Sequence, residues 1–231
     1  MFFWNKIRKI KTIADCIGSE KGKTFLVIGA GGTLREYSEP IKAFIDKYKP
    51  VTIGINKMTD FHVPDYHLWT NSQRWEEFGG CISEKSKMMF GSGLPSKLIK
   101  KHFTGKYIKV DYAASLKKAS LQKIDYKKGF IYGNYRTAGC LAIMIAHLLG
   151  ASEIFIVGMD GFTLHKREDV EKGLQNQHVY GKGFTDDASW EECVEKDRLV
   201  YENLQSIENF GINFRIITPT VFEKFYKKAL E

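Results

Sequence analysis

A glycine-rich turn follows the first strongly apolar segment of the chain, in the stretch TFLVIGAGGTL. The turn contributes a run of small residues: Gly29, Gly31, Gly32 and Thr33. Glycine lets backbone N–H groups approach an anion closely, because it has no side chain to hold the ligand away. The dinucleotide-binding fingerprint G-x-G-x-x-G would place a further glycine where this chain has Leu34. The turn therefore predicts a phosphate-binding loop that differs from the dinucleotide-binding loop.

Small and amide side chains also follow several later apolar segments. Amides both donate and accept hydrogen bonds, which suits a base edge, a ribose hydroxyl or a sugar oxygen. If these segments are parallel strands, their carboxyl ends meet at one edge of a sheet, where such sheets bind ligands. We therefore expect a nucleotide-type ligand beside the glycine-rich turn. The further residues expected to contact it are Asn56, Asn71, Asn134, Thr137, Ala138, Gly158, Met159, Asp160 and Gly161.

The segments that must position these residues alternate between two hydrophobic patterns. Short apolar runs predict strands at residues 24–29, 51–56, 65–71, 86–91, 106–112, 129–134, 153–160 and 213–218. Helical periodicity predicts helices at residues 35–49, 72–79, 137–151, 189–211 and 221–230. The helix at 189–211 is expected to pack through an apolar face: Val194, Leu199, Val200, Leu204 and Ile207. The alternation predicts a single α/β, Rossmann-like domain at 21–231, with a mostly parallel sheet and helices on both faces.

Two segments fall outside this alternation. Residues 1–20 place Lys and Arg among apolar residues at roughly helical spacing, which predicts an amphipathic helix with a basic face. Such a helix can pack on the domain, contact a second copy of the chain or lie on a membrane surface, and these alternatives stay open. Residues from about 162 to 188 are rich in charged residues, glycine and amides, which predicts a lid over the domain.

The overall composition narrows the choice of partners. A net charge of +8 and a pI of about 9.1 favour anions such as nucleotides, phosphorylated sugars, nucleic acid or an acidic membrane surface. The lysines are dispersed rather than striped, so we expect no nucleic-acid partner. The four cysteines include no C-x-x-C pair, so we expect no zinc site. With neither a secretory signal peptide nor an apolar run of membrane-spanning length, a cytoplasmic location is predicted, and peripheral contact with the inner membrane stays open.

The order of the motifs resembles that of bacterial family 42 sialyltransferases and of the central domain of motility-associated glycosyltransferases that modify flagellin. Their early I-x-G-x-G-x-S-L loop is matched by VIGAGGTL, and their turns after the second and third strands by GINK and WTNS. Their T-S-G helix start is matched by TAG at 137–139, and their S-G-I-D-F strand end by VGMDG at 157–161. The resemblance extends over residues from about 24 to 220.

The resemblance implies a glycosyltransferase whose donor is a CMP-activated sialic or related nonulosonic acid. The acceptor would be a glycan or glycoprotein in surface polysaccharide, lipopolysaccharide or flagellin glycosylation. Carried over by position, the contacts to the donor phosphate are Gly31, Gly32 and Thr33. The contacts to the phosphate and sugar are Asn56 and Asn71, and those to the nucleoside are Thr137, Ala138, Gly158 and Asp160. The resemblance implies no required metal or other cofactor, and the chain has no D-x-D motif.

A catalytic base is the point at which this chain departs from the family. The family has a histidine in a lid segment of the form H-Y-x-G-H-S, and here the corresponding stretch QHVYGKG has Lys182 at that position. His178 lies four positions earlier, with Tyr180 between them. Either His178 is the base, or Lys182 is the base with a lowered pKa, or the chain is not such a transferase. Only His178 has an unperturbed pKa near neutrality.

Two other functions stay open at this stage. The strand-end pattern also resembles archaeal pterin-diphosphokinase-like proteins, which would need magnesium held by carboxylates such as Asp160, Asp186 and Asp187. The altered lid base is also compatible with a non-catalytic nucleotide-binding module of a glycan biosynthesis protein. A dependence of activity on magnesium would separate the two enzymes.

Overall fold

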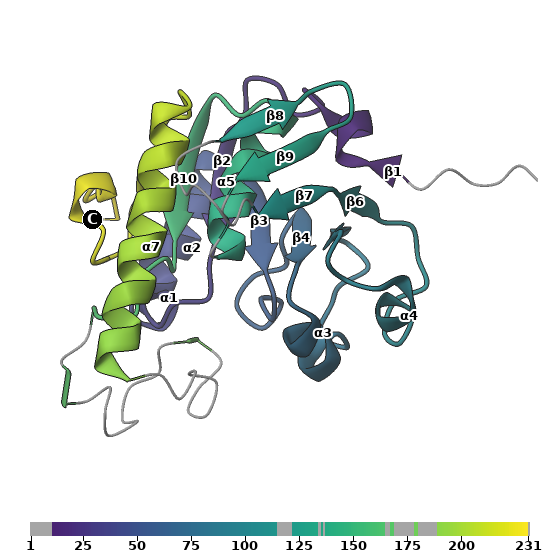
Figure 1. The fold of residues 1–231 in the computed structure, drawn as a ribbon. Coiled ribbons are helices and arrows are strands. Elements are labelled where there is room, and N and C mark those ends of the chain that lie inside the picture. The colour runs from purple at the N-terminus through teal and green to yellow at the C-terminus, as the bar shows by residue number, and fades with distance from the viewer. Residues whose placement is uncertain are drawn as a thin grey trace, which may run out of the picture.

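The computed structural model describes residues 11–114, 122–133, 135, 137–164, 167–168, 178–179 and 189–230. Its centre is an eight-stranded parallel sheet in the order β1-β6-β5-β4-β3-β2-β10-β11 (Figure 1). These strands are β1 (Lys11–Thr12), β2 (Thr24–Ile28), β3 (Val51–Ile55), β4 (Tyr66–Trp69), β5 (Lys87–Gly91), β6 (Ile108–Val110), β10 (Glu153–Val157) and β11 (Phe214–Ile216). The predicted fold class, an α/β domain with a mostly parallel sheet, is confirmed.

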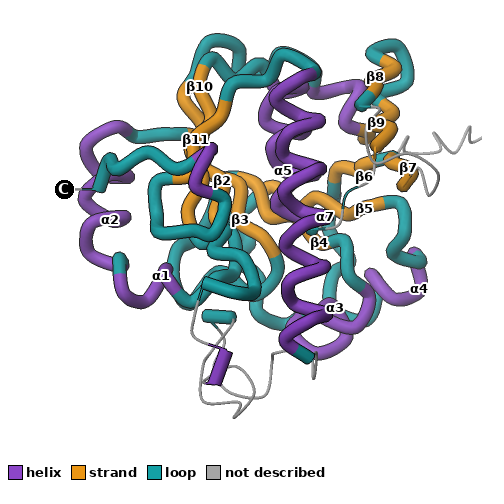
Figure 2. Tube along the Cα trace, turned by 60° about the vertical axis from the view of Figure 1, so that its left-hand side comes forward, coloured by secondary structure: helices purple, strands orange, loops and turns teal. Residues whose placement is uncertain are grey.

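Helices cover both faces of the sheet, which is why its central strands are apolar throughout. Along β2, Phe25 and Val27 pack toward one helical layer, and Leu26 and Ile28 pack toward the other. The first layer holds α5 (Ala138–Leu149) and α7 (Trp190–Asn209). The second holds α1 (Thr33–Glu36), α2 (Ser38–Tyr48), α3 (Ser72–Phe78) and α4 (Ser96–Ile99). Figure 2 shows α2 and α5 on opposite sides of the strands.

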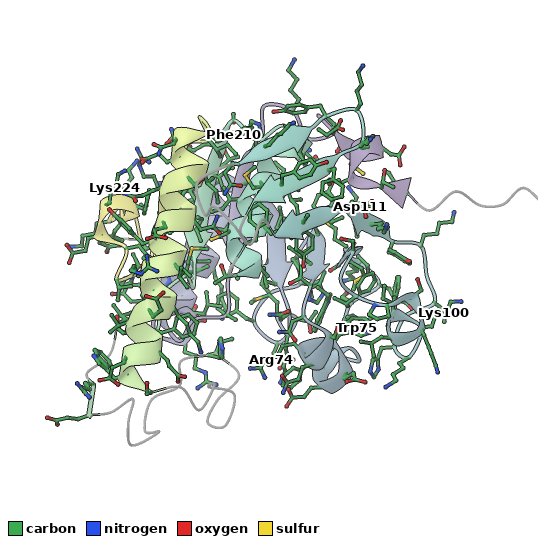
Figure 3. The ribbon with its side chains drawn as sticks, viewed as in Figure 1. Arg74, Trp75, Lys100, Asp111, Phe210 and Lys224 are labelled. Atoms are coloured by element: carbon green, nitrogen blue, oxygen red, sulfur yellow. The ribbon has the colours of Figure 1, made fainter. Side chains whose placement is uncertain are left out.

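The second layer has an aromatic cluster of its own beneath α3 and α4. Trp75 of α3, labelled in Figure 3, contacts the ring of Trp69 edge-on at 5.0 Å between centroids. It also contacts Phe90 at 4.8 Å, and its indole N–H donates to the Leu98 carbonyl at 2.9 Å. These contacts fix α3 and α4 on the strands β4 and β5.

None of the helices in the described part of the chain is long and apolar enough to span a bilayer.

A second, smaller sheet corrects the prediction for residues 129–134. It has the order β7-β9-β8, with β7 (Tyr112–Ala114), β8 (Lys123–Asp125) and β9 (Phe130–Gly133). β9 therefore is not a strand of the central sheet, although it leads into α5 as predicted. β7 begins directly after β6, with only Asp111 between them, so the chain leaves the main sheet at this residue. β9 pairs with β7 rather than with a strand of the main sheet.

Helix α7 packs through part of the predicted face. Of the five predicted residues, Val200, Leu204 and Ile207 are buried, whereas Val194 is 48% exposed and Leu199 is only partly buried. The buried face also includes Cys193 and Asp197. From Cys193 through Asp197, Val200 and Leu204 to Ile207 the spacing is four, three, four and three residues, which is the helical repeat. The prediction missed Asp197 because it counted apolar residues only.

Three other predicted helices also differ from the structure. The helix at 35–49 is divided at Tyr37 into α1 and α2, with Pro40 in the first turn of α2, where proline is tolerated. After Val221 the chain forms only the short 3-10 helix η2 (Glu223–Phe225), which buries Phe225, and Lys227 then donates to the Ile216 carbonyl. Residues 11–16 form β1 and the 3-10 helix η1 (Ile13–Cys16) rather than an α-helix, and residues 1–10 lie outside the described residues.

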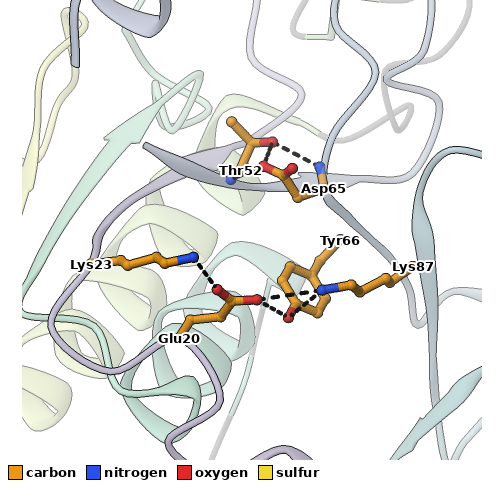
Figure 4. Close-up of polar contacts among 6 residues, drawn as sticks. All are labelled: Glu20, Lys23, Thr52, Asp65, Tyr66 and Lys87. Carbon is orange, nitrogen blue, oxygen red and sulfur yellow. Dashed lines mark hydrogen bonds and ion pairs between the residues drawn. The ribbon is translucent and has the colours of Figure 1, made fainter. Parts of the chain in front are cut away.

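Polar contacts tie the amino ends of the strands together at the opposite end from the loops predicted to bind ligand. Glu20 accepts hydrogen bonds from Lys23 at 2.8 Å, Tyr66 at 2.6 Å and Lys87 at 3.4 Å (Figure 4). Burial alone would raise the pKa of Glu20, but these hydrogen bonds outweigh it and hold the pKa at about 2. The turn before β2 is thereby fixed to the first residues of β4 and β5.

Candidate functional site

The chain order of the sheet creates a crevice at its carboxyl edge. From β2, the chain adds β3, β4, β5 and β6 on one side and β10 and β11 on the other. In open α/β sheets such a reversal leaves a space beyond the strand ends, because the connecting helices diverge to opposite faces. A cleft with a cavity volume of about 150 Å³ lies at this point, and its lining includes residues that follow β2, β3 and β10.

Most of the residues predicted from the sequence line this one cleft. They are Gly29, Gly31, Asn56, Thr137, Ala138, Gly158, Met159, Asp160, Gly161 and His178. Gly32, Thr33 and Asn71 are not among the lining residues. Asn71 instead caps α3, where its side chain accepts from the Arg74 N–H at 2.9 Å. Asn134, Tyr180 and Lys182 lie outside the described residues.

The remaining lining residues were not predicted. They are Ala30, Ile55, Gly139, Phe162, Val200 and Phe222. Gly139 was present in the helix-start motif, but the others are mainly apolar and carry no polar signal in the sequence. They form walls of the cleft, and Val200 and Phe222 reach it only through the packing of α7 and of the segment after β11.

The glycine-rich loop is bonded to the loop that follows β10. The N–H of Gly29 donates to the Val157 carbonyl at 2.8 Å, and the N–H of Gly31 donates to the Gly158 carbonyl at 2.9 Å. The N–H of Thr33 donates to the Asp160 carboxylate at 2.9 Å, and the Thr33 hydroxyl donates to its other oxygen. This corrects the expectation that Gly31 and Thr33 hold a phosphate through their N–H groups, because both groups are already taken by the protein.

Asp160 occupies the position expected for the anion. A Cβ atom at residue 31 would lie 2.4 Å from the Asp160 Cγ, so glycine is needed there to admit this carboxylate. Asp160 is 4% exposed, and burial raises its pKa to about 6 despite the hydrogen bonds from Thr33. The loop thus binds an anionic group, but one that belongs to its own chain.

The amino terminus of α5 offers the cleft a second set of N–H groups. The Thr137 hydroxyl caps the helix by accepting from the Cys140 N–H at 3.3 Å. The N–H groups of Ala138 and Gly139 belong to the first turn, where an α-helix supplies no backbone acceptor. Both residues line the cleft, and the positive end of the helix dipole lies there with them. A Cβ at Gly139 would lie 2.4 Å from the Met159 Cε, so this glycine also lets Met159 close the wall.

Asn56 supplies an unpaired acceptor to the same cleft. Its φ of 55° is left-handed, a conformation that asparagine tolerates better than most residues. Its side-chain Oδ1 is buried without a partner among the described residues. Its main-chain carbonyl accepts from the Nε2 of the buried His67. Burial lowers the pKa of His67 to about 4, against the effect of this hydrogen bond, so the ring is neutral and holds the turn in place.

His178 reaches the cleft from the lid segment. Its neighbour Val179 donates its N–H to the Ala30 carbonyl at 2.7 Å, and the Arg35 guanidinium donates to the Val179 carbonyl. The pair at 178–179 is therefore fixed to the glycine-rich loop, with His178 lining the cleft. A histidine at this place could accept a proton from a bound hydroxyl group.

The start of the lid segment is fixed to α7. Asp197 accepts from the N–H of Phe162 at 2.8 Å, from the N–H of Thr163 at 2.9 Å and from the Thr163 hydroxyl at 2.7 Å. Burial raises the pKa of Asp197, while these hydrogen bonds oppose the rise. Helix α7 itself begins with a capping box between Ser189 and Glu192. The sequence did not single out Asp197, since its role depends on contacts with residues far along the chain.

The comparisons with known proteins concern the fold alone. No family model matches the chain, and no curated protein matches its sequence. Among solved structures, a mammalian sialyltransferase in complex with Gal-beta-1-3GalNAc-ortho-nitrophenol is 15% identical, with a TM-score of 0.44. A second structure of a mammalian sialyltransferase is 12% identical, with the same TM-score. Each match covers 86% of this chain and 70% of the other. Similarity at this level assigns no role to any residue, so the functional argument rests on the cleft itself.

Proposed function

We propose that the protein is a glycosyltransferase that moves a sialic or related nonulosonic acid from a CMP-activated donor to a glycan acceptor. The observation that carries this proposal is the convergence of the predicted residues. They were chosen from short motifs between positions 29 and 182, and most of them line a single cleft at the reversal point of the sheet. Such a position is the usual nucleotide site of a doubly wound sheet.

The chemistry of the cleft suits a nucleotide with one phosphate. Asn56 Oδ1 is an acceptor without a partner among the described residues, and the exocyclic amino group of cytosine or a ribose hydroxyl would satisfy it. The first N–H groups of α5 suit the phosphate, because they combine open donors with the positive end of the dipole. We therefore assign the phosphate to Ala138 and Gly139, in place of Gly31 and Thr33.

His178 is the proposed catalytic base. It would take the proton of the acceptor hydroxyl as that oxygen bonds to the anomeric carbon of the donor sugar. The bond from that carbon to the phosphate oxygen breaks, and CMP leaves with the electron pair. The dipole of α5 would stabilise the negative charge that develops on the leaving phosphate. Lys182 is proposed to attract the negative charge of the donor, and Tyr180 stays a candidate residue from the same sequence motif.

Nucleotide binding provides the first test. Calorimetric titration with CMP, UMP, GMP and AMP should give the tightest binding for CMP. Incubation with CMP-activated nonulosonic acids should then release CMP, and faster in the presence of a glycan acceptor. Equal affinity for all four nucleotides, or no release of CMP with any activated sugar, would contradict the proposal.

The magnesium-dependent alternative has less support among the described residues. Diphosphate transfer would require a cluster of metal ligands, and in this part of the chain no group of three or more His, Cys, Asp or Glu side chains could hold a metal ion. Asp186 and Asp187 lie outside the described residues. Activity that survives EDTA would support sugar transfer, and activity that requires magnesium would favour diphosphate transfer.

A further inference from the structure

One edge of the molecule is formed by a chain segment that has many lysines and no acidic residue. Between positions 85 and 110 the charged residues are lysines and one histidine, with no Asp or Glu and no Arg. These lysines are Lys85, Lys87, Lys97, Lys100, Lys101, Lys106 and Lys109. The overall charge of +8 is thus unevenly distributed along the chain.

The fold turns the lysines of this segment outward. In α4 and the loop that leads to β6, the apolar residues Leu94, Leu98 and Ile99 pack on the aromatic cluster beneath. The outward positions are exposed lysines, which we call the basic edge: Lys97, Lys100, Lys101 and Lys106. Figure 3 shows Lys100 at the periphery of the molecule, on the side of α4. The apolar residues of this segment thus face the interior, and its lysines form the surface.

Neighbouring carboxylates neutralise only part of this charge. Lys101 pairs with Glu76 at 2.8 Å, and Lys109 pairs with Asp111 at 2.6 Å. Within the described part of the chain, no ion pair involves Lys97, Lys100 or Lys106. By contrast, the lysines of α2 and of its carboxyl-terminal cap alternate with acids: Lys42 pairs with Glu39, and the capping Lys49 pairs with Asp46.

We propose that the basic edge binds the anionic surface of a lipid bilayer. Lysine is a compact point charge that responds to a diffuse negative field, whereas recognition of individual phosphates usually employs the planar fork of arginine. The lysines lie on α4 and the loop after it, and the neighbouring Phe103 and Tyr107 pack inward, so no exposed phenylalanine or tyrosine is available there for base stacking. A flat, delocalised anionic surface fits this arrangement better than a nucleic acid.

The chain entering the fold at this edge has a matching composition. β1 is the edge strand, and it pairs with β6, the strand that follows the basic edge. The residues before β1 read MFFWNKIRKI, which combines aromatic residues with Lys and Arg and has no acid. Figure 1 places β1, β6 and α4 on the same side of the molecule, away from α7. Basic and aromatic residues together favour a membrane interface.

The test compares two triple variants of the full chain that lose the same charge. One is Lys97→Gln with Lys100→Gln and Lys106→Gln, and the other is Lys42→Gln with Lys47→Gln and Lys49→Gln on α2. Both should retain the wild-type unfolding temperature within a few degrees, because all six side chains are exposed. Binding is measured by co-sedimentation with phosphatidylcholine vesicles that contain or lack phosphatidylglycerol.

The wild type should bind only the vesicles that contain phosphatidylglycerol. Loss of the three lysines of the basic edge should weaken this binding about a hundredfold, since each lysine near an anionic membrane contributes about fivefold. The α2 variant should bind within a few-fold of the wild type. Raising the ionic strength from about 0.15 M to about 1 M should release the wild type, because the screening length falls to about 3 Å.

Three outcomes would overturn the proposal. The first is that the wild type does not bind anionic vesicles, and the second is that the two triple variants lose equal amounts of vesicle affinity. The third is that the wild type binds a duplex oligonucleotide through the same lysines more tightly than it binds vesicles. The test does not depend on the proposed sugar transfer, since the cleft lies at the carboxyl ends of β2 and β10, away from the basic edge. His178→Ala should therefore leave vesicle binding unchanged.

Discussion

The glycine-rich loop after β2 and the amino terminus of α5 face the same cleft with the same kind of group, the backbone N–H. In the loop, the N–H groups of Gly29, Gly31 and Thr33 are bonded to residues of the β10 loop. At α5, the first-turn groups of Ala138 and Gly139 have no backbone acceptor. The loop has the more conspicuous sequence, yet these three of its N–H groups are already bonded, whereas the first-turn groups of the helix are available as donors. An anion site is therefore decided by which N–H groups remain unpaired, and the number of glycines is a poor guide to it.

The largest effect is expected at His178, which lies outside both the glycine-rich loop and the amino terminus of α5. His178→Ala should lower turnover about a hundredfold or more, the usual size of a general-base effect, with little change in the affinity for CMP. Lys182→Ala should mainly raise the apparent KM for the donor, because it removes an attractive charge rather than a base. Steady-state kinetics with a CMP-activated sugar checks both variants. Loss of turnover in Lys182→Ala with normal turnover in His178→Ala would reverse the assignment.

A pH titration of stability tests whether Asp160 fills the loop. Its pKa is about 6 in the folded protein against 3.8 for the free group, so folding favours the protonated form. That contribution is fully present below about pH 4 and is lost as the pH rises through about 6. Over this window the wild type should lose on the order of 2–3 kcal/mol relative to Asp160→Asn, which does not ionise. Denaturant unfolding of both proteins at several pH values measures the difference, and parallel pH profiles would mean that Asp160 is not buried against Thr33.

A charge placed at α5 should separate ligand binding from stability. Ala138→Asp puts a carboxylate in the first helical turn, which is favourable for the helix dipole by about 0.3–1 kcal/mol. The same charge should repel the donor phosphate and weaken CMP binding about tenfold or more. The neutral control is Ala138→Asn, which should reduce the affinity much less. If the loop rather than α5 holds the phosphate, calorimetry will show similar CMP affinities for the two variants.

The smallest effect is expected in the loop itself, at Gly32. Its φ of −62° and ψ of −27° are ordinary helical values, so Gly32→Ala should fold normally and be stabilised by up to about 1 kcal/mol. If α5 holds the phosphate, the affinity for CMP should change by less than about twofold. A large loss of affinity in this variant, measured beside Ala138→Asp, would return the phosphate to the glycine-rich loop.

Local sequence patterns predicted most strands, because the hydrophobic pattern of a segment depends on whether one or both of its faces are buried. The run Phe25 to Ile28 is apolar throughout since helices cover both sides of β2, and the same holds for the strand before Gly158. The edge of the sheet at which the predicted site residues gather also followed from this alternation. These predictions needed only the periodicity of neighbouring residues.

Contacts between distant residues escaped the same reasoning. Thr33 and Asp160 are 127 positions apart, and no local pattern indicates that one binds the other. Asp197 breaks the apolar repeat of α7, so it was not included in the predicted packing face, although it holds the start of the lid segment. The pairing of β9 with β7, and not with a central strand, likewise depends on contacts between distant segments. The sequence therefore indicated the place of the cleft more reliably than the hydrogen bonds within it.

The pairing of β2 with β10 has a consequence for how the molecule is made. A ribosome delivers β2 and β3 early, but β10 starts only at Glu153, after the small sheet and α5 have been synthesised. Until then one side of β2 has no partner strand, and the N–H groups of Gly29 and Gly31 lack the carbonyls that receive them in the finished protein. A nascent chain of this length exposes an unpaired apolar strand, which is the feature that chaperones and aggregation both act on. The cleft is thus completed late, when the last third of the chain docks onto the first.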